Sequence, residues 1–266
     1  MSIAREGLDN SPRPLGGNSS HFLASAIHAE ALARLEHLVE SGLRCGIIVG
    51  PRGTGKSTVL GVFAQNCRAA GCETVSIDVT GIDEIQFLER LAQRLEVTSR
   101  ARGRAIALWS EVTDALGGRA LAGRPCVLIV DHLDRAMPDC QHFVRRLSSR
   151  GGRNLAETWV LGFSGRLFPM VPREWREQND LRIELGAMSQ QESYAFLQSL
   201  LDVFQRPRDA FDTVAETLVA AAGGIPAELR RLSELSLLVA EDAHARVSPE
   251  ALRSVLDELR GLRFSA

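Results

Sequence analysis

Lysine is nearly absent from this chain of 266 residues, since Lys56 is the only one and every other strong base is arginine. Aromatic residues make up only 5% of the chain. The chain also lacks a large excess of charge of one sign, because the formal net charge is −2. The net charge therefore does not indicate binding to nucleic acid or to an anionic membrane. Contact with DNA through a local basic patch stays an open alternative.

Long apolar runs and paired cysteines are also missing. No stretch approaches the ~20 apolar residues that a membrane-spanning helix needs, and the first residues lack the apolar segment of a secretory signal. The five cysteines are scattered without metal-binding spacing, which indicates reduced thiols. We therefore expect a cytoplasmic globular protein, and the 45% of hydrophobic residues are enough for one α/β core and a smaller domain.

The one lysine belongs to a nine-residue motif, Gly50-Pro51-Arg52-Gly53-Thr54-Gly55-Lys56-Ser57-Thr58. This segment fits GxxxxGK[ST], the Walker A phosphate loop, whose backbone N–H groups surround the β-phosphate of a nucleotide. The lysine of such a loop reaches the β- and γ-phosphate oxygens, and the hydroxyl of Ser57 is a ligand of Mg²⁺. An apolar run at 45–49 predicts a buried strand before the loop, and helical spacing over 57–64 predicts a helix after it. The sequence thus predicts a site for ATP and Mg²⁺.

A second apolar run, at 126–130, ends at Asp131. A carboxylate at the carboxyl end of a buried parallel strand lies where open α/β sheets bind ligands. We interpret Asp131 as the Walker B aspartate, which holds Mg²⁺ opposite Ser57. The next position is His132, where many ATPases of this kind carry a glutamate that orients the attacking water. Two alternatives follow, namely that Asp134 positions the water or that hydrolysis is slow.

Three further strands are predicted at 73–79, 158–163 and 181–185, which gives five strands in all. Helices are expected in the same part of the chain at 28–41, 82–95 and 105–116. Ser164 directly follows the strand at 158–163 and is a candidate for the sensor 1 role, in which a polar side chain contacts the γ-phosphate or the water. A serine before a glycine is also ordinary turn chemistry.

From residue 189 onward the pattern becomes entirely helical. Ser189 to Glu192 form a capping box, and later helices are predicted at 211–222, 226–241 and 249–259. We therefore expect three parts, namely a flexible arm at 1–20, a nucleotide-binding α/β domain at 21–186 and a helical lid at 187–266.

Together these features resemble an AAA+ ATPase, a P-loop family with a parallel five-stranded sheet flanked by helices and a small C-terminal helical lid. More specifically, the chain resembles the ExeA/GspA-type general secretion pathway ATPases. The resemblance is carried by Phe22-Leu23, the segment from His28 to Leu35, the segment from Leu185 to Tyr194, and Gly224-Ile225-Pro226. It implies a module that binds ATP, assembles with copies of itself, and drives assembly or remodelling of a secretion, envelope or transport complex. Such a module would reach the inner membrane through a partner, and related modules regulate DNA transposition.

The sequence departs from this family at two positions. His132 replaces an acidic residue, and Ala227 replaces the arginine that usually follows Pro226 in the lid. Arg230 or Arg231, one helical turn further, is a candidate replacement for this sensor 2 arginine beside ATP. AAA+ proteins also present an arginine finger to the γ-phosphate of a neighbouring subunit.

Arg176 and Arg182 are the candidates for that finger, because they lie between the sensor strand and the lid.

A second function class stays open beside the ATPase. The D-x-x-D pattern from Asp131 to Asp134 also ends Walker B in signalling ATPases, which implies a nucleotide-dependent switch or scaffold with slow hydrolysis. We favour the ATPase because the residues for binding ATP are complete.

Overall fold

The sheet has five parallel strands in the order β2-β3-β4-β1-β5. This computed structural model describes residues 25–97, 104–124, 126–149, 157–165, 171–177, 179–240 and 246–263. The arm expected at 1–20 lies outside them. The strands are β1 (Cys45–Val49), β2 (Glu73–Asp78), β3 (Cys126–Asp131), β4 (Glu157–Phe163) and β5 (Leu181–Glu184). The prediction of a parallel five-stranded sheet is confirmed.

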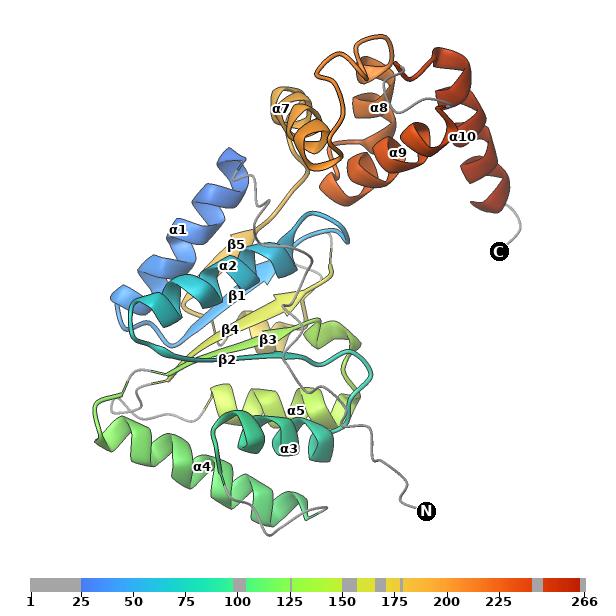
Figure 1. Ribbon diagram of the computed structural model, residues 1–266. Coiled ribbons are helices and arrows are strands. Elements are labelled where there is room, and N and C mark those ends of the chain that lie inside the picture. The colour runs from blue at the N-terminus through green and yellow to red at the C-terminus, as the bar shows by residue number, and fades with distance from the viewer. Residues whose placement is uncertain are drawn as a thin grey trace, which may run out of the picture.

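Helices cover both faces of this sheet, as a parallel sheet requires. They are α1 (Ala26–Glu40), α2 (Lys56–Ala69), α3 (Glu84–Arg94), α4 (Ala105–Leu121), α5 (Pro138–Ser148) and the short α6 (Arg173–Arg176), with a 3₁₀ turn η2 (Leu133–Arg135) after β3. Figure 1 shows α1 and α2 on one face and α3, α4 and α5 on the other. Every residue of β1, β3 and β4 is consequently buried, whereas the edge strands β2 and β5 are partly exposed.

Two helices of this part were not predicted from the sequence. Helix α5 carries its apolar residues at helical spacing, with Cys140, Val144 and Leu147 buried against the sheet. Helix α6 has only four residues, of which Trp175 is buried, and is too short for a periodic signal. The thiols of Cys45, Cys67, Cys126 and Cys140 are buried in this core, and burial raises the pKa of each to about 12.

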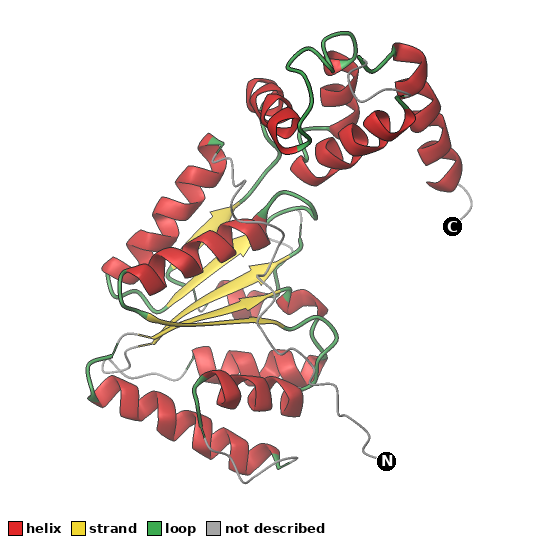
Figure 2. Cartoon of the chain, viewed as in Figure 1, coloured by secondary structure: helices red, strands yellow, loops and turns green. Residues whose placement is uncertain are grey.

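The C-terminal part consists of helices, as Figure 2 shows. They are α7 (Gln190–Val203), α8 (Ala215–Ala222), α9 (Pro226–Val239) and α10 (Pro249–Arg263). They enclose a core of their own around Phe211, Leu218 and Leu229. Helix α8 begins four residues later than predicted, because Phe211 lies buried in a turn before it. The domain boundary near residue 187 stays a prediction, and no helix in the described ranges is long and apolar enough to cross a membrane.

Candidate nucleotide-binding site

The predicted phosphate loop connects β1 to α2 at the carboxyl edge of the sheet (Figure 1). Gly53 and Gly55 have left-handed backbone conformations, with φ of +86° and +97°. Gly50 lies so close to the residue after β5 that an added Cβ would stand 2.2 Å from the carbonyl oxygen of Leu185. Only glycine fits these positions without strain, so the loop can bend tightly and expose its backbone N–H groups.

Lys56 begins α2 and its side chain is buried against the loop. Its Nζ donates hydrogen bonds to the carbonyl oxygens of Gly50 and Pro51, both at 2.8 Å. Because an ammonium group has three donors, one N–H remains for a phosphate oxygen. Burial lowers the pKa of Lys56, while the carboxylates of Asp131 and Asp134 act in the opposite direction. The loop therefore fixes this cation at its centre.

The two predicted magnesium ligands lie in contact. Ser57 Oγ donates a 2.5 Å hydrogen bond to Asp131 Oδ2, and Asp131 is only 1% exposed. Gly162, on the neighbouring strand β4, makes room for this carboxylate, since an added Cβ would lie 2.6 Å from Asp131 Oδ1. Hydroxyl and carboxylate oxygens are the donors that Mg²⁺ prefers, so the side chains present fit this ion.

His132 follows Asp131 in a left-handed conformation, with φ of +58°. Its buried Nδ1 lies 3.2 Å from Asp78 Oδ2 and 3.7 Å from Asp131 Oδ2, without the alignment of a hydrogen bond to either. Burial tends to raise the pKa of Asp78, but the hydrogen bonds that it accepts from Thr80, together with the proximity of His132, outweigh burial, so the pKa is lowered. Sequence analysis missed Asp78, although a polar residue at the end of a predicted strand is a signal for a site at that edge.

Asp134 and Ser164 are also brought together. The backbone N–H of Ser164 donates a 2.8 Å hydrogen bond to Asp134 Oδ1. The contact joins η2 to the end of β4 through the backbone of Ser164. The sensor 1 role would use the hydroxyl of Ser164, so this contact does not test it and the role stays a prediction. One oxygen of Asp134 is thus engaged in holding two loops together.

The lid reaches the phosphate loop through the segment predicted to lie near ATP. Pro226 begins α9, and the N–H of Ala227 donates a 3.2 Å hydrogen bond to the carbonyl oxygen of Gly53. The guanidinium of Arg230 instead pairs with Glu234 at 2.8 Å, with its side chain 52% exposed. The structure therefore places Pro226 beside the loop and Arg230 in an ion pair along the surface of α9.

The two finger candidates lie on the surface. Arg182 is in the edge strand β5, pairs with Glu184, and is opposite Ile47 rather than at the carboxyl end of β1. Arg176 is exposed at the end of α6. Exposure is what contact with a second subunit requires, and the finger role of either arginine stays a prediction.

A buried histidine on α1 completes the support of the loop. His28 Nε2 lies 2.7 Å from the carbonyl oxygen of Thr54, and Nδ1 lies 2.5 Å from Ser25 Oγ. Because a carbonyl oxygen only accepts, Nε2 carries the proton of this bond. The sequence predicted the helix but gave no sign that this residue contacts the loop, since the two are 26 positions apart.

Comparison with known proteins identifies the family. A family model described as the AAA ATPase domain matches residues 28–160, which is half of the chain. The chain belongs to the AAA ATPase family. The matched range includes both the phosphate loop and the strand that ends at Asp131, so the ligand of this AAA ATPase domain at its P-loop is a nucleotide.

This AAA ATPase is also similar to an individual protein at low identity. It is 23% identical over 240 residues to general secretion pathway protein A of Aeromonas hydrophila, and the match covers 88% of this chain and 44% of that protein. The chain thus spans less than half the length of that relative.

Solved structures show the same P-loop AAA+ fold. Cdc6p of Pyrobaculum aerophilum matches with a TM-score of 0.66 and 15% identity over 91% of this chain and 71% of that one. The RuvB Holliday junction branch migration motor of Thermotoga maritima matches with a TM-score of 0.57 and 15% identity over 90% and 70%.

Proposed function

We propose that this AAA ATPase binds ATP with Mg²⁺ at its phosphate loop and hydrolyses it to ADP and phosphate. The observation that carries the proposal is the contact between Ser57 and Asp131, which combines the hydroxyl of Walker A and the buried carboxylate of Walker B at one point. Lys56 and the loop N–H groups hold the β- and γ-phosphate oxygens, and Ser57 and Asp131 hold the ion. The ion held by these two side chains would supply positive charge that stabilises the negative charge developing on the phosphate oxygens.

The energy of hydrolysis would serve to assemble or remodel a larger complex. Similarity to general secretion pathway protein A supports a secretion or envelope complex as the client, and a partner protein would then bring this cytoplasmic module to the inner membrane. We further propose that copies of the chain assemble when nucleotide is bound. In that assembly the exposed Arg182 or Arg176 would reach the ATP of the neighbouring subunit.

The second candidate function is a nucleotide-dependent switch with slow hydrolysis that acts on DNA. The specific observation that favours it is His132 in place of a glutamate, together with the engagement of Asp134 by the Ser164 N–H. The structural likeness to Cdc6p and to a Holliday junction motor is compatible with it, although at 15% identity this likeness concerns the fold alone.

ATP turnover measured against protein concentration, with and without DNA, tests the two candidates. A motor that assembles hydrolyses ATP at several turnovers per minute or more, and its activity per subunit rises with concentration. A switch binds ATP with equal affinity but turns it over far more slowly, and DNA changes that rate. If calorimetry detects no binding of ATP, both candidates are wrong.

A further inference from the structure

We propose that Asp78 is a positioning residue that turns the ring of His132 so that Nε2 accepts a hydrogen bond from the attacking water. The pair would replace the glutamate that this family usually carries after the Walker B aspartate. This inference rests on the proposed hydrolysis of ATP, because it assigns the water-orienting group of the same site.

The sheet topology brings the two residues together. Strands β2 and β3 are parallel neighbours, and Asp78 and Asp131 are aligned as the last residues of the two strands. The left-handed conformation of His132 turns the chain directly after Asp131. In this arrangement His132 Nδ1 lies 3.2 Å from Asp78 Oδ2.

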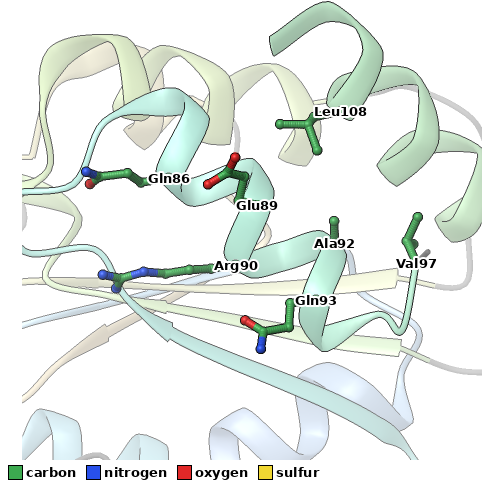
Figure 3. Close-up of a pocket in the computed structure, with 7 residues that line it drawn as sticks. All are labelled: Gln86, Glu89, Arg90, Ala92, Gln93, Val97 and Leu108. Carbon is green, nitrogen blue, oxygen red and sulfur yellow. The ribbon is translucent and has the colours of Figure 1, made fainter. Parts of the chain in front are cut away.

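Other contacts hold the end of β2 in place. The Thr80 N–H donates a 2.9 Å hydrogen bond to Asp78 Oδ1, which leaves Oδ2 toward the imidazole. Arg90 Nη1 donates a 3.3 Å bond to the carbonyl oxygen of Asp78. Arg90 is one of the residues that line a pocket of about 450 Å³ along α3, and Figure 3 shows its side chain extending from that helix. Both bonds restrict the movement of Asp78.

The chemistry of the pair selects one tautomer of the ring. A carboxylate only accepts hydrogen bonds, so the ring nitrogen that faces Asp78 should carry the proton. That nitrogen is Nδ1. A neutral imidazole protonated at Nδ1 carries its lone pair on Nε2. Nδ1 is buried, while the His132 side chain is 25% exposed. The exposed part of the side chain therefore consists of atoms other than Nδ1.

The competing carboxylate is less suited to this task. One oxygen of Asp134 accepts the Ser164 N–H, which fixes that carboxylate between η2 and β4. His132, in contrast, lies 3.7 Å from Asp131 Oδ2, the oxygen bonded to Ser57. The imidazole thus lies directly beside the proposed magnesium ligands.

The first test needs neither nucleotide nor metal. Nitrogen-15 NMR of the full chain at about pH 8.5, where neutral imidazoles predominate, reports the tautomer of each ring. His132→Gln assigns the signal by its disappearance. We expect the Nδ1–H tautomer for His132 in the wild type and in Asp78→Asn, whose amide oxygen still accepts, and a shift toward Nε2–H in Asp78→Ala. A wild-type ring protonated at Nε2 would overturn the inference.

The second test separates positioning from folding. Asp78→Ala should lower kcat for ATP hydrolysis about tenfold while KM and ATP affinity change less than about twofold, and Asp78→Asn should restore most of the rate. Asp114→Ala, which removes an exposed acid from α4, is the control and should leave all three values unchanged. Unchanged kcat in Asp78→Ala would overturn the inference.

A double variant decides whether Asp78 acts through His132. In the His132→Glu variant the group at position 132 is a carboxylate, which has no tautomers for Asp78 to select. Adding Asp78→Ala to this variant should therefore not lower kcat. An equal tenfold loss in both backgrounds would assign Asp78 another role and overturn the inference. A wild type with the expected tautomer and ATP binding but no turnover would instead overturn the proposed function.

Discussion

Ser57 and Asp131, 74 positions apart in the chain, are joined by a hydrogen bond of 2.5 Å between Ser57 Oγ and Asp131 Oδ2. We expect Asp131→Asn to abolish measurable hydrolysis, because it keeps the shape of the side chain but removes the charge that faces Mg²⁺. ATP binding should persist at reduced affinity. Steady-state turnover together with calorimetry checks both expectations, and turnover at the wild-type level would show that Asp131 is not the Walker B aspartate.

Removal of the lysine should affect binding itself. Lys56→Ala deletes the only ammonium group beside the β- and γ-phosphates, so ATP affinity should fall more than tenfold, which is more than ~1.4 kcal/mol. Arg68→Ala, at the far end of the same helix, removes a positive charge from the surface and should leave affinity unchanged. Equal affinities for Lys56→Ala and the wild type would refute the assignment of the phosphate loop.

The space beside Asp131 gives a prediction about stability. Gly162→Ala places a Cβ 2.6 Å from Asp131 Oδ1, so the strand or the carboxylate must move, and we expect a loss of about 1–3 kcal/mol in the free energy of unfolding. Gly117→Ala is the control, because nothing lies within 4 Å of its added Cβ in helix α4, and it should stabilise the chain by up to about 1 kcal/mol. Denaturant unfolding measures both, and equal effects would contradict the crowding at Gly162.

The contrast between Gly162 and Lys56 shows what could be predicted from the sequence. Lys56, Ser57 and Asp131 belong to contiguous motifs whose chemistry depends on local spacing, so the phosphate loop and the end of β3 can be predicted from the sequence alone. Gly162 and Asp78 matter only because β4 and β2 are the neighbours of β3. The order of strands in a sheet depends on long-range packing, which no local pattern specifies.

The lid shows the same limit. The capping box at Ser189 was predicted from its spacing and is present, with the Glu192 N–H bonded to Ser189 Oγ. The same glutamate also accepts a 3.4 Å hydrogen bond from the N–H of Ile27, which is 165 positions away. This contact between the lid and α1 could not be predicted from either segment alone.

An arginine finger that acts in trans gives a prediction about how turnover depends on protein concentration. If Arg182 or Arg176 serves the ATP of a neighbouring subunit, turnover per subunit should rise with protein concentration, and alanine at that position should remove the rise without changing ATP affinity. Arg173→Ala is the matched control, since Arg173 begins the same short helix and its side chain pairs with Glu177 directly after that helix. Constant turnover per subunit across the concentration range would exclude a finger in trans.

The last prediction decides whether Asp134 or His132 orients the attacking water. If Asp134 chiefly holds the Ser164 N–H, Asp134→Asn should keep turnover within about threefold of the wild type, because the amide oxygen of asparagine still accepts that bond. Asp134→Ala leaves the N–H without its acceptor and should lower both stability and turnover. If Asp134 instead orients the water, the loss of charge in Asp134→Asn should abolish hydrolysis while ATP binding stays intact. Single-turnover rates of Asp134→Asn and His132→Gln, measured with ATP affinity, decide which side chain acts on the water. The conservative substitution of the water-orienting residue should slow the chemical step while the affinity for ATP is kept, whereas the other variant should react at close to the wild-type rate.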